Sequence, residues 1–219
     1  GVENKEESAD SSYRSESAFG PYDSDFAEKS AYTTGYFTEA KIAFMEGLSS
    51  AYGLRLDHHS QTGEHLTWRI APVYSLADTG TRFSATIGTG FKSPSLFQLY
   101  SSYGSPDLNP EESLGVDVGI QQELLNDKLT VGITWFRNNF DELITFDPNT
   151  FIFSNISEAK STGFEYFTRV KLCRTVSAGV DLAYTETEDE GTGLTLLRRP
   201  HVKVAADVSY DSYDGARVT

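Results

Sequence analysis

A proline-rich and aromatic segment, residues 91–113, carries the side chains of this sequence that best suit ligand contact. It reads FKSPSLFQLYSSYGSPDLNPEES and holds three of the chain's seven prolines and four aromatic residues. Proline reduces the entropy that a loop loses on ordering, and aromatic rings offer a large contact area with few rotatable bonds. We therefore expect Phe97, Tyr100 and Tyr103 to face a ligand. In the alternative, the side chains of 96–100 only fix the loop to its neighbours.

Histidine side chains offer a second kind of chemistry, which is metal binding. Asp57, His58, His59 and His65 lie close together in the sequence, and histidine and aspartate are common zinc ligands. Their spacing matches no standard zinc pattern. The preferred interpretation is a solvated loop without a metal, and the role of His58 and His59 stays open.

The composition of the chain excludes several classes of function. Its 219 residues carry 32 acidic and 18 basic side chains, a formal net charge of -14. Binding a phosphate backbone needs a basic surface, so we expect no nucleic-acid partner. No run of about 18 apolar residues encodes a transmembrane helix. A protease or lipase would need a histidine paired with serine or aspartate, and nothing near His201 and Ser177 supports one, so we expect no enzyme, no catalytic residue and no cofactor.

Apolar and polar residues alternate with a period of two along most of the chain, a pattern typical of β-strands. In 114–120, for example, Leu114, Val116, Val118 and Ile120 share one face. The alternation recurs, in places more weakly, at 36–44, 52–57, 66–74, 81–91, 129–135, 164–172, 176–184 and 202–210. The pattern predicts nine full strands of about 9–14 residues, with a cut strand at each end.

The connections between these strands alternate between short and long. Short links are expected near 46–48, 77–80, 125–127, 173–175 and 211–215, and longer ones at 6–30, 59–64, 92–112, 142–157 and 188–196. Alternate links of an up-and-down sheet emerge at the same end, and outer-membrane barrels have short periplasmic turns and longer extracellular loops.

The polar face of the strands suits the interior of such a barrel. It is rich in glycine, threonine and serine and carries charges of both signs, as in Glu165 with Arg169 and Lys203 with Asp207. The sequence therefore predicts an all-β fold, an antiparallel up-and-down transmembrane β-barrel. A soluble β-sandwich or small barrel also alternates apolar and polar residues and remains the alternative.

The segment 91–113 resembles a motif of the TonB-dependent outer-membrane receptors, F-K-x-P-x-L-x-x-L-Y followed by G-x-P-x-L-x-P-E-x-S. The motif positions are filled by Phe91, Lys92, Pro94, Leu96, Leu99, Tyr100, Gly104, Pro106, Leu108, Pro110, Glu111 and Ser113. Further segments at 32–37, 135–147, 155–167 and 196–204 resemble strands of the same family, so the likeness spans about 31–211. The cobalamin transporters are the nearest branch, followed by the siderophore receptors.

The resemblance implies a barrel of about 22 strands around a plugged lumen. Residues 1–219 would then be part of that barrel domain, about nine or ten strands, with the plug domain and the last strands absent. The implied function is TonB-dependent uptake of a bulky, scarce nutrient, cobalamin or an iron-siderophore, across the bacterial outer membrane. The implied partners are the TonB complex, reached through the plug, and outer-membrane lipid. The alternatives are another outer-membrane barrel, such as a porin or adhesin, and a soluble β-sandwich binding domain.

Overall fold

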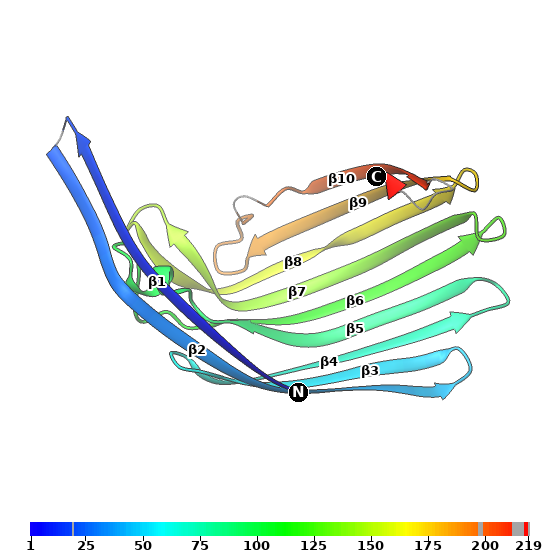
Figure 1. Ribbon diagram of the computed structural model, residues 1–219, viewed down its shortest axis with the longest axis horizontal. Coiled ribbons are helices and arrows are strands. Elements are labelled where there is room, and N and C mark those ends of the chain that lie inside the picture. Colours follow the sequence, from blue (N-terminus) through cyan, green and yellow to red (C-terminus); the bar gives the residue numbers. More distant parts are fainter. Residues whose placement is uncertain (19, 197–198, 212–216, 219) are drawn as a thin grey trace.

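The chain forms one antiparallel β-sheet in which every strand pairs with the next along the sequence (Figure 1). The computed structural model describes residues 1–18, 20–196, 199–211 and 217–218. The strands are β1 (Val2–Ser17), β2 (Gly20–Met45), β3 (Leu48–His59), β4 (Gly63–Leu76), β5 (Thr81–Lys92), β6 (Glu111–Leu124), β7 (Leu129–Asp147), β8 (Ile152–Lys171), β9 (Val176–Asp189), β10 (Val202–Asp211) and β11 (Arg217–Val218). A short helix, α1 (Leu96–Tyr100), lies between β5 and β6. In the described ranges, no helix is long and apolar enough to cross a membrane.

One face of the sheet is apolar and is left uncovered by the rest of the described chain. Residues directly opposite on paired strands point to the same face. A row of such residues crosses five strands and consists of Ile120, Ile133, Tyr166, Leu182 and Val204. All five side chains are exposed. A β-sandwich would bury this face against a second sheet, whereas a barrel wall turns it towards lipid. The single sheet therefore confirms the up-and-down barrel architecture and rules out the sandwich for the described residues.

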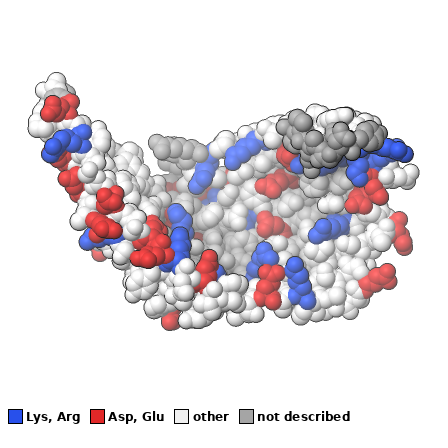
Figure 2. Space-filling model, in the orientation of Figure 1, with Lys and Arg blue, Asp and Glu red and all other residues white. Residues whose placement is uncertain are grey.

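The opposite face of the sheet is polar, as the sequence predicts for a lumen. Arg169 on β8 donates two hydrogen bonds to the carboxylate of Asp181 on β9, at 2.7 and 2.8 Å. The face of the sheet seen in Figure 2 carries interspersed acidic and basic side chains. Charges of both signs can pair there at a hydrated surface without a desolvation cost.

The connections follow the predicted sorting between the two ends of the sheet only in part. Short turns at 46–47, 77–80, 125–128 and 172–175 lie at one end, called the turn end below (Figure 1). The two longest connections, from β5 to β6 with α1 and from β9 to β10, lie at the other end, called the loop end. The short links from β1 to β2, from β3 to β4 and from β7 to β8 also lie there (Figure 1). The predicted link at 211–215 falls almost entirely outside the described residues.

The prediction of a long polar loop at 6–30 is wrong, because this segment forms a β-hairpin. β1 and β2 pair from Val2↔Tyr36 to Ser17↔Gly20, with a register shift between Ala9 and Ser11. Figure 1 shows the hairpin rising away from the sheet at the loop end. Strand pairing gives the backbone of a polar segment its hydrogen bonds. Water reaches both faces of the hairpin, so neither face needs apolar residues. The sequence of 6–30 therefore lacks the period-two apolar pattern that would indicate strands.

The nine predicted full strands are confirmed, whereas one strand length, one link and the helix differ from the expectation. Within the described residues, β2–β10 correspond to the nine predicted strands and β1 and β11 lie at the two ends, but β1, with 16 residues, is longer than a cut strand. The expected long link at 142–157 lies mostly in strands, since β7 continues to Asp147 and β8 begins at Ile152. Helix α1 was not expected, although Ser95 and Gln98 have the spacing of a capping box.

Candidate ligand-binding site

The first half of the motif segment (residues 91–113) is folded around the capped helix α1. The Ser95 hydroxyl accepts from the Gln98 backbone N–H at 3.2 Å, and the Gln98 side chain accepts from the Ser95 N–H at 2.9 Å. Leu96 and Leu99 are 2% and 5% exposed, while Phe97 is 45% exposed. The helix therefore buries its two leucines and leaves the phenylalanine outside.

The second half of the motif segment folds back against the helix. Gly104 N–H donates to the Ser101 carbonyl at 2.8 Å, and Ser105 N–H donates to the Gln98 carbonyl at 2.9 Å. A Cβ at Gly104 would lie 2.8 Å from the backbone of Leu99, which explains the glycine of the motif. Pro94 and Leu108 are buried, Pro110 is half-buried and Pro106 is exposed.

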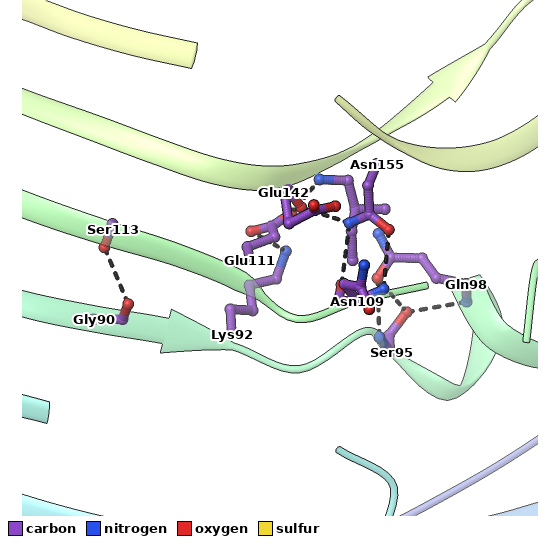
Figure 3. Close-up of polar contacts among 10 residues, drawn as sticks. Gly90, Lys92, Ser95, Gln98, Asn109, Glu111, Ser113, Glu142 and Asn155 are labelled. Carbon is purple, nitrogen blue, oxygen red and sulfur yellow. Dashed lines mark hydrogen bonds and ion pairs between the residues drawn. The ribbon is translucent and has the colours of Figure 1, made fainter. Parts of the chain in front are cut away.

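Polar side chains tie the motif segment to strands β7 and β8 (Figure 3). Glu111 accepts from Lys92 Nζ at 3.2 Å and from the Ile144 N–H at 3.1 Å. Asn155 on β8 accepts from the Asn109 N–H at 2.9 Å and donates to the Asn109 carbonyl at 3.1 Å. The same Asn155 amide donates to the carbonyl of Glu142, which has a positive φ of 55°.

Two of the three predicted ligand-facing residues lie in an exposed aromatic cluster, which consists of Phe26, Phe97, Tyr103, Phe146, Phe151 and Phe153. Phe97 lies edge-on to Phe26 and Phe153, with ring centroids 6.4 and 6.1 Å apart. Tyr103 lies edge-on to Phe146 at 6.1 Å. Rings at such distances and angles attract one another. The cluster thus joins the β1–β2 hairpin, the motif segment and the β7–β8 hairpin at the loop end.

Tyr100, the third predicted residue, makes different contacts. Its hydroxyl donates to Gln61 Oε1 in the β3–β4 turn at 2.8 Å. The Lys29 Nζ on β2 lies 5.0 Å from its ring centroid, within the range of a cation–π interaction. Tyr100 therefore connects the motif segment to two neighbouring elements, and its contact with a ligand stays a prediction.

The histidines near 57–65 are engaged separately and do not gather around a common point. Asp57 is 3% exposed and accepts two hydrogen bonds from Arg55, at 2.6 and 2.7 Å. His65 stacks on Phe91 with centroids 4.2 Å apart. His58 lies 3.9 Å from Glu64. Across the described residues, no three histidine, cysteine or acidic side chains form a group that could hold a metal ion.

Two cavities open beside the motif segment. The first, of about 330 Å³, is lined by Phe91–Pro94, by His59 and by charged residues of β1 and β3, among them Lys5, Glu7 and Arg55. The second, of about 610 Å³, lies between the β7–β8 hairpin and the segment before β10. Ligand pockets have volumes of about 300–1,000 Å³. Both cavities fall within this range, the first near its lower limit.

Most residues that contact the motif segment were not predicted from the sequence. Phe26, Phe146, Phe153, Asn155 and Gln61 all fall in segments that were expected to be loops or loop edges. No spacing in the sequence indicates that these segments meet.

A comparison with known families identifies the fold. The model of the family described as TonB dependent receptor-like, β-barrel, matches residues 2–219. This chain belongs to that family. The matched residues contain the motif segment, so its resemblance to the TonB-dependent receptors is confirmed at the level of the family.

Solved structures of two receptors and a copper transporter have the same fold over the part that this chain covers. The ferric enterobactin receptor PfeA of Pseudomonas aeruginosa, in complex with enterobactin, is 22% identical with a TM-score of 0.71 over 85% of this chain. The copper transporter OprC is 18% identical with a TM-score of 0.74 over 97%. The siderophore receptor PirA of Pseudomonas aeruginosa is 20% identical with a TM-score of 0.70 over 97%. The chain spans only 32%, 40% and 46% of the lengths of these three proteins.

Proposed function

We propose that the chain forms part of the barrel wall of a bacterial outer-membrane receptor that captures a bulky metal chelate and imports it with energy from TonB. The loop end would face the outside, because outer-membrane barrels carry their longer loops there. The apolar face would meet outer-membrane lipid. The plug through which the family contacts TonB is part of the proposed receptor.

The aromatic cluster carries this proposal. Four of its side chains, Phe97, Tyr103, Phe146 and Phe151, are between 38% and 60% exposed. Exposed aromatic side chains that three separate segments hold together form a preorganised contact surface, which reduces the entropy cost of binding. Such a surface at the mouth of a barrel suits a large ligand with flat or apolar parts.

A ferric siderophore is the favoured ligand class. PfeA is named as a ferric enterobactin receptor and PirA as a siderophore receptor, and an iron chelate of this kind is large enough to contact several rings at once. The resemblance of the sequence to the cobalamin transporter branch supports cobalamin as the second candidate.

Uptake assays in cells can test this function. The full open reading frame that encodes this chain is deleted, and uptake of radiolabelled ferric siderophores and of cobalamin is compared with the parent strain and with a strain lacking TonB. We expect both deletions to abolish uptake of one ferric siderophore. Loss of cobalamin uptake alone would favour the second candidate. Unchanged uptake of both ligand classes would contradict the proposal.

The residues Phe97 and Tyr103 are expected to contribute directly to ligand affinity. Each aromatic contact is worth about 0.5–1.5 kcal/mol beyond buried area, and 1.4 kcal/mol corresponds to a tenfold change in affinity. In the full-length receptor, we expect the double variant Phe97→Ala and Tyr103→Ala to bind the transported chelate at least about tenfold more weakly, as measured by equilibrium binding to whole cells.

A matched control for this variant is Phe83→Ala. Phe83 is 43% exposed, similar to Phe97, but it lies on β5 near the turn end. We expect the Phe83→Ala receptor to bind the transported chelate with the same affinity as the unmodified receptor. Equal affinities of the double variant and the control, at equal surface expression, would show that the cluster does not contact the ligand.

A further inference from the structure

The turn between β3 and β4 is held by a histidine side chain that acts as a hydrogen-bond acceptor. The backbone N–H groups of Gln61 and Thr62 both point at His59 Nδ1, at 3.2 and 3.3 Å. Neutral imidazole has one nitrogen with a free lone pair, whereas both nitrogens of the protonated ring are donors. The observed geometry therefore requires a neutral His59 with its proton on Nε2.

The same turn holds the motif segment in place. Gln61 accepts the hydrogen bond from the Tyr100 hydroxyl at 2.8 Å. The Thr62 and Ser93 hydroxyls lie 3.0 Å apart and share a hydrogen bond. The turn that His59 closes thus contacts both the start of the motif segment and helix α1.

The second histidine at this turn responds differently to protonation. His65 Nε2 lies 3.1 Å from both the carbonyl and the hydroxyl of Thr62. A ring N–H can donate to that carbonyl in the neutral and in the protonated state. Protonation of His65 is therefore compatible with its contacts, whereas protonation of His59 is incompatible with both of its own.

The surroundings of His59 favour the neutral ring. The charged and titratable groups facing it are Glu3, Lys5 and Glu7 on β1, Arg55 and Asp57 on β3, His65 on β4 and Lys92 on β5. Partial burial lowers the pKa of His59 below its ordinary value of 6.5; His65 and Lys5 lower it further, and Glu7 opposes them. The stabilisation from the neutral ring is thus complete above about pH 6.5 and is lost as the pH falls through the lower pKa of the folded state.

We propose that His59 is a proton-sensitive latch. In its neutral form it accepts the hydrogen bonds that close the turn 60–62, and the closed turn fixes the motif segment. On protonation it releases the turn and the motif segment. A protonated ring would present an N–H to two other N–H groups, so the two hydrogen bonds would be replaced by repulsion. The consequence is a loop end that loosens in acid while the sheet below it stays paired. This inference concerns the free protein and needs no ligand.

Amide hydrogen exchange of the full-length receptor in detergent micelles can test the latch. Protection factors for residues 60–63 are measured between about pH 7.5 and about pH 4.5 and corrected for the intrinsic pH dependence of exchange. We expect protection at Gln61 and Thr62 to fall about tenfold or more at the acidic end, with amides in the middle of β6 unchanged. Constant corrected protection over this range would overturn the proposal.

Two variants separate His59 from the other titrating groups. An asparagine side chain accepts from a backbone N–H two residues ahead but does not titrate, so His59→Asn should keep the turn and lose the response to pH. His65→Gln should keep the response. A response that persists in His59→Asn, or that disappears in His65→Gln, would refute the assignment to His59. The measurement on the unmodified receptor remains decisive if either variant fails to fold.

Discussion

Replacing Leu96 with alanine will unfold the motif segment locally and leave the sheet intact. Leu96 is 2% exposed and is the largest side chain buried to this degree among the described residues. Removing a buried leucine side chain costs about 2–5 kcal/mol. Helix α1 has only five residues, and a helix this short has almost no stability of its own. Its order therefore depends on the packing of Leu96 and Leu99.

Hydrogen exchange would report this local unfolding. In the full-length receptor, we expect the protection of amides in 97–108 to fall at least about thirtyfold, which corresponds to about 2 kcal/mol. Amides in the middle of β6–β9 should keep their protection. Leu172→Ala serves as the control, because Leu172 is 64% exposed in a turn at the opposite end of the sheet. Unchanged protection in Leu96→Ala would show that the capping box and the loop contacts suffice without this side chain.

The variant Gly163→Ala is expected to destabilise the sheet itself. An added Cβ would collide with the backbone carbonyl of Tyr184 on the paired strand β9 and would lie 2.8 Å from the ring of Phe136. A carbonyl in a strand ladder cannot rotate away as a flexible side chain can, so β8 and β9 must separate locally. Overpacking of this kind costs about 1–3 kcal/mol.

Unfolding of the full-length receptor by urea in lipid vesicles measures this effect. We expect the free energy of unfolding of Gly163→Ala to decrease by about 2 kcal/mol. Gly53→Ala is a matched control, since Gly53 also lies inside a strand but its added Cβ meets only Arg69 Cβ, at 3.9 Å. A loss of stability that is equal in both variants would attribute the effect to strand glycines in general and contradict the proposed collision.

The β8 segment around Gly163 shows how much a local pattern can predict. The weak period-two alternation of Phe164, Tyr166 and Val170 against Glu165 and Arg169 assigns the two faces, and pairing with β7 and β9 agrees with it. This succeeds because a strand presents successive side chains to opposite sides, and lipid and water select different residues on each side. The need for glycine at 163 is invisible at this level, since it depends on the carbonyl of Tyr184.

The hairpin at 6–30 shows where the local pattern fails. Its strands are polar on both faces, so the sequence gives the same signal as a solvated loop, and only the pairing of β1 with β2 distinguishes them. Asp57 is a second case. Its nearness in sequence to three histidines leaves a metal site as the less favoured interpretation beside a solvated loop, whereas in the fold its carboxylate accepts hydrogen bonds from Arg55, two residues away on the same face.

The sequence by itself determined the family, the strand faces and the motif segment, because each of these depends on residues that are close along the chain. Only the tertiary structure decided which side chains meet at the loop end. Phe97 contacts Phe26 and Phe153, which are 71 and 56 residues away by number. Such contacts depend on the register of several strand pairs at once, and a shift of one residue in any pair would turn the side chains to the other face.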